Sequence, residues 1–398
     1  KEKVIVTLLP TDKSIAQRCA VLGLDFDQND IGEDVKSTIG AVKKFKSFNA
    51  SATLDLGNSG TGIRLLSGYI AGSGKDCMLV GDESLSKRPM NRIAKPLNDW
   101  GAKISLFDDQ FPPIKIKAAE LKPEYFYDLK IPSAQIKSCL LLAALASKTK
   151  ITISENTPSR DHTERMLEEC EADIKREGKH IIFDGRKEIV RKFIDVPKDF
   201  SSAAYLIAAN IITNKTIQLD NVGVNPTRTA FLDVLSEMGA SIVLENTEIK
   251  SNEPRATIRS SATHELNGVT IEGRKIPNLI DEIPLIAILA MFAKGKTVVR
   301  DAKELRYKES DRISLLLSNM KKFDPNIGIT EYDDGFEIMP SAKKDTNAVN
   351  IMTGGDHRII MSFVIASLGS GKKVTFDETS SVETSFPNFF EVISKWYQ

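Results

Sequence analysis

The feature of this 398-residue sequence that most limits its fold is a unit that recurs five times. Each copy is an apolar stretch of helical composition, then a short break, then a few alternating β-branched residues. Since Ala and Leu surround most of each helical part, we expect these helices to be buried. The copies occupy residues 63–82, 136–156, 203–222, 283–302 and 359–378, and a weaker copy covers residues 14–26.

A second type of helix, followed by a turn and another strand, also repeats. Its copies occupy residues 88–106, 160–177 and 225–244, at intervals of about 70 residues, a supersecondary period rather than that of a solenoid. Together the two helices predict a βαβαββ module, of which about six fit the length. The chain is too long for one ordinary core, so we expect two domains of three modules each. The alternative is chance similarity among Ala- and Leu-rich helices.

The charge balance argues against several classes of partner. Lys and Arg together number 54, as do Asp and Glu, so the formal net charge is zero. We therefore expect neither nucleic acid nor an anionic membrane as a partner. No apolar run reaches the roughly 20 residues of a membrane helix. The first ten residues have the pattern of a strand and not of a signal peptide.

The cysteines give no sign of a disulfide framework or a metal site. None forms a CxxC pair, and none has a His partner at metal-binding spacing. We expect reduced, buried thiols, no metal, and a cytosolic protein. The four are Cys19, Cys77, Cys139 and Cys170.

The first candidate anion site lies in LPTDKSIAQR, where a helix is predicted to begin. Lys13 and Ser14 stand at its start, and Arg18 falls on the same face about one turn later. A hydroxyl, an ammonium and a guanidinium at a helix N-terminus favour an anion. The alternative is that Asp12 is only an N-cap and Lys13 is solvated.

Two glycine-containing segments precede further helices. GNSGTGIR places Asn58 and Thr61 among glycines, where backbone N–H groups can approach a ligand closely. It is no Walker loop, because no Gly-Lys-Ser/Thr follows. GDESLSKRP puts Arg88 just before a proline that opens a helix.

Hydroxyl groups stand at three more predicted helix starts. Ser133 could be a simple N-cap, but Gln135 and Lys137 are unusual residues to lead into so apolar a helix. We interpret His162 as a structural histidine in preference to a base. The other polar groups at these starts are Ser159, Arg160, Ser201 and Ser202.

The densest group of charges lies in the C-terminal half. Asp281 and Glu282 precede an apolar helix, and Arg358 follows GGDH at another helix start. The segment LRYKESDR alone would be typical of a solvated face. Because cations and hydroxyls recur at one helix start after another, the pattern predicts a site for ligands with several phosphate or carboxylate groups. The charged residues of LRYKESDR are Arg306, Lys308, Glu309, Asp311 and Arg312.

Together these segments resemble the EPSP synthase family, the 3-phosphoshikimate 1-carboxyvinyltransferases. The resemblance runs in family order from residue 9 to residue 391, and several segments are long and unusual. They are DKSIAQR, LGNSGTGIRLL, GDESLSKRPM, IPSAQIKSCLLLAAL, SRDHTERML, DFSSAAYLIAAN, the stretch from IPNLIDEIP to LRYKESDRI, GGDHRIIM and SFPNFFE.

The resemblance implies an α/β protein with the two-domain enolpyruvyl transferase fold. Each domain would hold three βαβαββ modules, as an inside-out α/β barrel. Residues 1–12 and 199–398 would form one domain, with much of the phosphoenolpyruvate side. Residues 13–198 would form the other, with the shikimate 3-phosphate side, and a cleft would lie between them.

The family reaction joins shikimate 3-phosphate to phosphoenolpyruvate and gives 5-enolpyruvylshikimate 3-phosphate and phosphate, a step of the shikimate pathway toward chorismate and the aromatic amino acids. The resemblance implies no metal and no organic cofactor. It implies small-molecule substrates, without nucleic acid or membrane partners, and a monomer in the cytoplasm.

Residue roles follow from the family motifs. Lys13 matches the lysine that contacts both substrates, Asp281 the carboxylate that receives the 5-hydroxyl proton, and Glu309 the proton-transfer carboxylate. The other groups implied for shikimate 3-phosphate are Ser14, Arg18, Ser133, Ala134, Gln135, Ser159 and Lys308. Those implied for phosphoenolpyruvate are Asn58, Gly60, Thr61, Arg88, Gln135, Arg312 and Arg358. Lys137 and Arg160 also fit the motifs.

The chain departs from the family pattern in three places. Thr11 and Asp12 replace the Gly and Ser that many members have before the lysine, and Asp12 could weaken anion binding. Residues 24–56 look shortened, so we expect that module to be degenerate. Thr384 stands where some relatives have a lysine that contacts phosphoenolpyruvate.

Two other functions compete. UDP-N-acetylglucosamine enolpyruvyl transferase carries a reactive cysteine in the loop before the arginine that matches Arg88, and an asparagine at the position that matches Ser14. This chain has no cysteine in that loop and a serine at position 14. A non-catalytic anion-binding protein would have lost an acid or base, but Lys13, Asp281 and Glu309 are present. Small Gly60 also predicts sensitivity to glyphosate.

Overall fold

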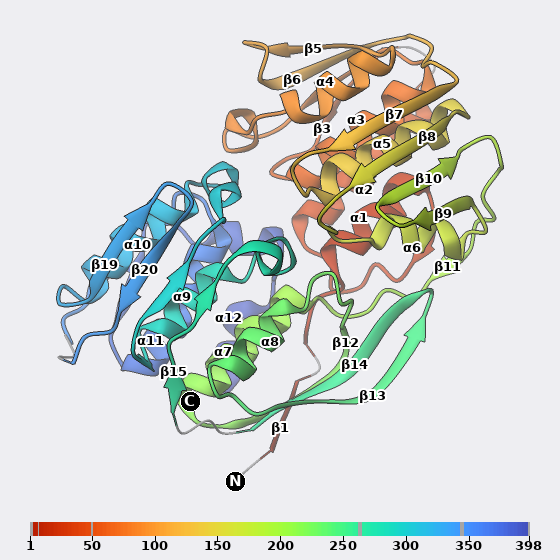
Figure 1. Cartoon of the computed structure of the whole chain (residues 1–398). Coiled ribbons are helices and arrows are strands. Elements are labelled where there is room, and N and C mark those ends of the chain that lie inside the picture. Colours follow the sequence, from red (N-terminus) through yellow and green to blue (C-terminus); the bar gives the residue numbers. More distant parts are fainter. Residues whose placement is uncertain (1–2, 7, 49–50, 262–264, 343–345, 397–398) are drawn as a thin grey trace. The chain divides into compact units, whose positions relative to one another are not determined.

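The computed structural model has a mixed α/β fold, drawn in Figure 1. Among the described residues, no helix is long and apolar enough to cross a membrane. The structure describes residues 3–6, 8–48, 51–261, 265–342 and 346–396.

The chain divides into two compact units. Unit 1 comprises Lys1–Thr11, Pro197–Ile249 and Pro254–Gln398, and unit 2 comprises Asp12–Val196 and Lys250–Glu253. The short segment Lys250–Glu253 is the tip of a hairpin whose strands otherwise belong to unit 1.

Unit 2 contains two complete βαβαββ modules of identical topology. In each, a buried helix joins two parallel strands, because a parallel pair needs a crossover connection. An antiparallel hairpin closes the module, and its last strand lies in the middle of the sheet. The first module is β3 (Ala52–Asp55), α3 (Gly60–Ser73), β4 (Cys77–Val80), α4 (Asn91–Trp100), β5 (Lys103–Phe107) and β6 (Phe111–Lys117), with strand order β3-β4-β6-β5. The second is β7 (Glu124–Leu129), α5 (Ala134–Ser147), β8 (Lys150–Glu155), α6 (His162–Glu169), β9 (Asp173–Glu177) and β10 (His180–Asp184), with order β7-β8-β10-β9.

The third module of unit 2 is incomplete, which corrects the expectation of three βαβαββ modules per domain. Strand β11 (Phe193–Ile194) pairs in parallel with β2 (Asp25–Phe26), and the helices are α1 (Lys13–Leu22) and α2 (Glu33–Ser47). In the described part of this segment, no hairpin follows α2. Because α2 occupies most of the sequence between β2 and β3, the shortened stretch 24–56 leaves no room for two more strands.

Unit 1 follows the same plan, with two complete modules and one shorter module. The first is β1 (Lys3–Val6), α7 (Phe200–Thr213), β12 (Thr216–Gly223), α8 (Ala230–Glu237), β13 (Ile242–Lys250) and β14 (Glu253–Ser260), with order β1-β12-β14-β13. The second is β16 (Thr270–Ile271), α9 (Ile283–Ala290), β18 (Thr297–Val299), α10 (Arg312–Phe323), β19 (Gly328–Tyr332) and β20 (Gly335–Met339), with order β16-β18-β20-β19. The shorter module is β21 (Val349–Ile351), α11 (His357–Ser370), β22 (Val374–Phe376) and α12 (Phe389–Trp396). Short β15 (Leu266–Asn267) and β17 (Ala293–Lys294) pair beside the second module. Short 3₁₀ helices are η1 (Leu85–Lys87), η2 (Gly273–Asn278), η3 (Lys303–Tyr307) and η4 (Ser380–Thr384).

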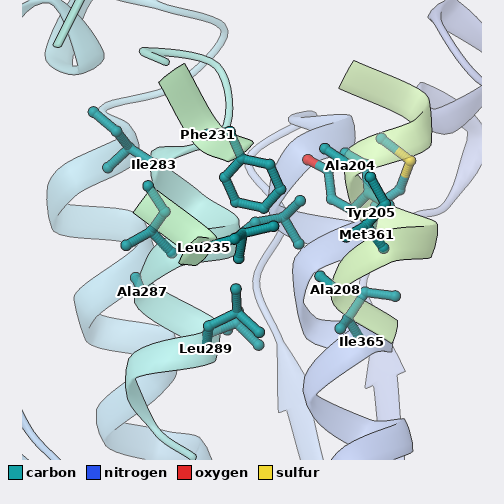
Figure 2. Packing of buried hydrophobic residues seen from close by; sticks show 14 of the residues in the cluster. Ala204, Tyr205, Ala208, Phe231, Leu235, Ile283, Ala287, Leu289, Met361 and Ile365 are labelled. Carbon is teal, nitrogen blue, oxygen red and sulfur yellow. The ribbon is translucent and has the colours of Figure 1, made fainter. Parts of the chain in front are cut away.

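The repeated apolar helices form the core of each unit, as their composition predicted. In unit 1, Figure 2 shows Tyr205 of α7 beside Met361 of α11, with Phe231 and Leu235 of α8 nearby. Burial of each large apolar side chain contributes about 1.5–3 kcal/mol. Packing of these helices in the core fixes the positions of their N-termini. The polar residues that the sequence singles out lie at these N-termini.

Helices α3 and α5 of unit 2 approach so closely that glycine is required. A Cβ at Gly68 would lie 2.0 Å from the carbonyl oxygen of Cys139, and one at Gly72 would lie 2.2 Å from that of Ala143. These two helices begin with Gly60 and Ala134, so their close packing brings two polar N-terminal segments together.

Candidate active site

The candidate residues fall into two clusters, one in each unit. We call the groups at the starts of α1, α3, α5 and α6, with Arg88, the unit 2 cluster. The unit 1 cluster is Asp281, Lys308, Glu309, Arg312, Asp356 and Arg358.

The start of α1 carries a lysine that is paired with a carboxylate. Oδ1 of Asp12 accepts a hydrogen bond from the backbone of Ile15 at 2.9 Å, so Asp12 is the N-cap. Nζ of Lys13 lies 2.9 Å from Oδ2 of Asp34 on α2, and Lys13 is half-buried. The alternative of a solvated Lys13 is therefore wrong, although the N-cap assignment of Asp12 is correct.

Arg18, one turn further along α1, is buried among hydroxyl groups. Its Nε donates to Oγ1 of Thr163 at 2.7 Å, and Nη2 donates to Oγ of Ser138 at 3.0 Å. Nη1 donates to the carbonyl oxygen of Ser14 at 2.8 Å. Burial lowers the pKa of Arg18 to about 10, against the opposing effect of Glu164, so it remains a cation at neutral pH.

The start of α3 lies against Arg88. Nη2 of Arg88 donates to Oδ1 of Asn58 at 2.6 Å, and Nδ2 of Asn58 donates to Asp82 at 2.8 Å. A Cβ at Gly60 would lie 2.6 Å from Nη1 of Arg88 and 3.4 Å from Nη1 of Arg64. A side chain at this position would require the Arg88 guanidinium to move.

Gln135 connects the starts of α3 and α5. Its Nε2 donates to Oγ1 of Thr61 at 2.8 Å, and its Oε1 accepts from Nη1 of Arg64 at 2.8 Å. Ser133 is the N-cap of α5, with Oγ accepting from the backbone of Ile136 at 3.4 Å. The structure thus brings together Asn58, Gly60, Thr61, Arg88, Ser133, Ala134 and Gln135.

The segment before α6 is held by buried charges. Ser159 donates from both its backbone nitrogen and its Oγ to Glu155. Nδ1 of His162 lies 2.7 Å from Oε1 of Glu253, and both residues are buried. This contact agrees with the structural role predicted for His162.

The unit 1 cluster gathers charges from three helix starts. Three cations surround Asp281: Lys308 and Arg312, each 3.6 Å away, and Arg358, 3.8 Å away. Arg358 also donates from Nη1 to the carbonyl oxygen of Asp281 at 3.1 Å. These ion-pair distances exceed hydrogen-bond length, so the cations are held near one carboxylate without close contact.

Arg312 is the centre of this cluster. Its Nη2 lies 2.5 Å from Oε2 of Glu309, and its Nε donates to Oδ2 of Asp356 at 2.7 Å. Burial alone would lower the pKa of Arg312, but Asp356 and Glu309 more than reverse that effect. Burial alone would likewise lower the pKa of Arg358, but the neighbouring charge of Asp281 contributes to a net rise. Both arginines are therefore permanent cations, suited to a carboxylate or phosphate.

Other residues singled out in the sequence have contacts with their neighbours. Oγ of Ser201 donates to Oε1 of Glu282 at 2.5 Å and accepts from Nη2 of Arg228 at 3.0 Å. Ser202 is held by its backbone nitrogen, which donates to the N-cap residue Asp199 at 2.8 Å.

Three buried carboxylates were missed by sequence reasoning: Asp34, Glu155 and Asp356. Asp356 had a signal, since it stands in GGDHR as the N-cap of α11. Asp34 lies on α2, whose sequence pattern is typical of a surface helix, and Glu155 is the last residue of β8. Nothing in the sequence distinguishes either residue from surface carboxylates. In the described ranges, no group of three or more His, Cys, Asp or Glu residues could hold a metal ion.

Comparison with known proteins decides the family. The model of the EPSP synthase (3-phosphoshikimate 1-carboxyvinyltransferase) family matches residues 8–393. The chain is 39% identical to a Synechocystis 3-phosphoshikimate 1-carboxyvinyltransferase, over 97% of the chain and 92% of the relative. It is 41% identical to that of Bacillus pumilus, over 94% and 85%. The chain belongs to the EPSP synthase family.

The solved structures agree with this membership and with the predicted fold class. EPSP synthase from Acinetobacter baumannii superposes with a TM-score of 0.82 at 36% identity, over 99% of this chain and 95% of that one. The enolpyruvyl transferase NikO from Streptomyces tendae superposes with a TM-score of 0.73 at 14% identity, a likeness of fold alone. The predicted family, fold class and class of enzyme are confirmed.

One departure from the EPSP synthase pattern is visible in the structure. Thr384, at the position where the resemblance implies a lysine in some relatives, ends η4 and donates from Oγ1 to the carbonyl oxygen of Ser381 at 2.7 Å. A threonine provides no positive charge at this position.

Proposed function

We propose that this chain transfers the enolpyruvyl group of phosphoenolpyruvate to the 5-hydroxyl of shikimate 3-phosphate, in the biosynthesis of chorismate and the aromatic amino acids. One observation carries the proposal: Arg312 and Arg358 meet two carboxylates, Asp281 and Glu309, in the same cluster. Anionic reactants need fixed cations, and addition followed by elimination needs groups that accept and return protons. The names of the relatives support the same reaction.

The chemistry assigns a role to each carboxylate. The 5-hydroxyl attacks C2 of phosphoenolpyruvate while C3 gains a proton, which gives a tetrahedral ketal phosphate. Loss of a proton from C3 then expels phosphate. In this proposal Asp281 takes the hydroxyl proton, Glu309 exchanges the proton at C3, and Lys13 contacts both substrates.

The binding groups divide between the clusters. Hydroxyl groups and Arg18 of unit 2 suit the phosphate and ring of shikimate 3-phosphate, and Arg88, Arg312 and Arg358 suit the carboxylate and phosphate of phosphoenolpyruvate. The groups proposed for shikimate 3-phosphate are Lys13, Ser14, Arg18, Ser133, Ala134, Gln135, Ser159, Asp281 and Lys308. Those proposed for phosphoenolpyruvate are Lys13, Asn58, Gly60, Thr61, Arg88, Gln135, Arg312 and Arg358.

The proposal includes a monomer in the cytosol that works without a cofactor. The four buried thiols suit a reducing compartment.

The test is phosphate release by the purified protein with both substrates, and with each substrate omitted in turn. We expect release only when both are present. UDP-N-acetylglucosamine in place of shikimate 3-phosphate is expected to give none, and release with it would favour the sister enzyme. No release at all, with shikimate 3-phosphate still binding in calorimetry, would indicate a binding protein and make Asp12 the first residue to change.

A further inference from the structure

Three polar atoms of Ser159 are held by one buried ion pair. The backbone nitrogen of Ser159 donates to Oε1 of Glu155 at 2.8 Å, and its Oγ donates to the same oxygen at 2.5 Å. The carbonyl oxygen of Ser159 accepts from Nζ of Lys137 at 3.3 Å. Nζ of Lys137 in turn lies 3.2 Å and 3.3 Å from the two oxygens of Glu155. The backbone and the side chain of Ser159 therefore both form hydrogen bonds with the Lys137–Glu155 ion pair.

This ion pair is withdrawn from water and linked to two further charges. The side chains of Lys137 and Glu155 have no exposed surface. Lys137 also lies 2.7 Å from Oε1 of Glu164, and Oε2 of Glu155 lies 3.1 Å from Arg176. A buried ion pair is tolerated only where its geometry is well satisfied, and a change to one partner exposes the other to a large penalty. The cluster is therefore a rigid support beneath Ser159.

The hydroxyl proton of Ser159 has two possible acceptors. An ionised carboxylate only accepts hydrogen bonds, so at 2.5 Å the single proton of this hydroxyl points toward Glu155. A phosphate group also only accepts, so the proton must turn toward it when phosphate binds. Since the backbone contacts to Glu155 and Lys137 do not depend on that proton, they keep Oγ in place while the hydroxyl turns.

We infer that Glu155, held by Lys137, is a positioning residue that fixes Ser159 for the phosphate group of the substrate. The inference rests on the proposed function, in which Ser159 binds the phosphate of shikimate 3-phosphate. Glu155 acts through Ser159 and does not touch the substrate itself. Its contribution therefore exists only while the Ser159 hydroxyl is present.

The test combines variants of Glu155 with Ser159→Ala and measures shikimate 3-phosphate binding by calorimetry, and KM and kcat in the phosphate-release assay. Glu155→Asp keeps the charge but withdraws the carboxylate by one methylene, and Glu155→Gln keeps the shape but removes the charge. We expect each to raise Kd and KM for shikimate 3-phosphate about tenfold, with kcat and the KM for phosphoenolpyruvate changed less than about twofold. In the Ser159→Ala background, itself weakened about tenfold, either change is expected to add less than about twofold.

Three results would overturn the inference. An equal loss with and without the Ser159 hydroxyl would indicate general structural damage. Tighter binding in Glu155→Gln with no change in Glu155→Asp would indicate simple charge repulsion of the phosphate. Unchanged binding in both would remove any role for Glu155.

Controls separate these outcomes from misfolding and from failure of the proposed function. Arg176→Gln loses only its contact with the other oxygen of Glu155, so we expect its Kd within about twofold of the unmodified protein. Thermal unfolding shows which variants are folded. If Glu155→Gln does not fold, Glu155→Asp still tests the inference, because it keeps a negative charge beside Lys137. Lack of turnover by the unmodified protein would refute the proposed function, whereas the binding comparison would still test Glu155.

Discussion

Arg312 donates from Nε to Oδ2 of Asp356 at 2.7 Å, and neither side chain has more than 1% of its surface exposed. Oδ1 of the same carboxylate accepts from the backbone nitrogen of Arg358 at 3.0 Å, as the N-cap of α11. One buried carboxylate therefore fixes the side chain of one arginine and the helix start of the other. Two of the three arginines proposed to bind phosphoenolpyruvate, Arg312 and Arg358, are therefore positioned by a residue that carries no assigned role.

The change Asp356→Asn tests this arrangement. Removal of one partner from a buried ion pair costs about 3–5 kcal/mol, so we expect the free energy of unfolding in urea to fall by about 3 kcal/mol. We also expect the KM for phosphoenolpyruvate to rise more strongly than the KM for shikimate 3-phosphate. Asp333→Asn is the control, because its side chain is 74% exposed and its ion pairs, with Lys303 at 2.7 Å and Arg306 at 3.9 Å, lie at the surface. It should change stability by less than about 0.5 kcal/mol, and equal effects of the two variants would contradict the prediction.

The thiols are expected to be inert while the protein is folded. Burial raises the pKa of Cys77 to about 11 and that of Cys139 to about 12, and Cys19 and Cys170 are also buried, with raised pKa values. At pH 8 a thiol of pKa 11 is ionised in only about one molecule in a thousand, and the thiolate is the reactive form. We expect Ellman's reagent to label no cysteine in the native protein and all four in denaturant. Rapid labelling of a native thiol would argue for a reactive cysteine, as in the sister enzyme.

The fold was largely predictable because its signal is local and repeated. The apolar helices, such as those beginning at Gly60 and Ile283, are apolar around most of their surface, and each is followed by a β-branched strand. The incomplete module of unit 2 was visible only as a shortened segment between β2 and β3. Which strands were missing depends on how much of that segment α2 occupies, which no periodic pattern specifies.

The local structure of the candidate site was predictable at helix starts and much less so elsewhere. Capping residues such as Asp12 and Ser133 have a sequence signature, since their side chains satisfy free backbone N–H groups. The carboxylates that pair with the cations have no such sequence signature. Asp34 lies 21 residues after Lys13, and Asp356 lies 44 residues after Arg312, so only the tertiary fold brings each pair together.

Gly60→Ala is expected to weaken phosphoenolpyruvate binding. The new Cβ would lie 2.6 Å from Nη1 of Arg88, which must move and weaken its hydrogen bond to Asn58. We expect the KM for phosphoenolpyruvate to rise about tenfold, with the KM for shikimate 3-phosphate within about twofold. The same assay measures the expected inhibition by glyphosate. Gly178→Ala is a control with open space around its Cβ, although its positive φ affects stability. Unchanged kinetics in Gly60→Ala would show that Arg88 does not need this space.

Glu309→Gln is expected to abolish turnover while the protein still binds shikimate 3-phosphate. In the proposed reaction Glu309 exchanges the proton at C3, and an amide cannot accept or return that proton. General acid–base catalysis typically contributes 10²- to 10⁴-fold, so we expect kcat to fall about a thousandfold. Glu309→Gln removes the negative charge beside Arg312 but keeps an oxygen that can accept from it, and Asp356 is unchanged, so the cluster should remain folded.

The measurements are phosphate release and calorimetric binding of shikimate 3-phosphate on the same preparation. The control is Glu265→Gln, at the surface partner of Lys294, which should behave like the unmodified protein. Turnover retained in Glu309→Gln would refute the role of Glu309, because no other change in this variant could restore a missing proton-transfer group. Lost turnover together with lost binding would instead place Glu309 in the binding of shikimate 3-phosphate, and Asp281 would then be the remaining candidate for the C3 proton.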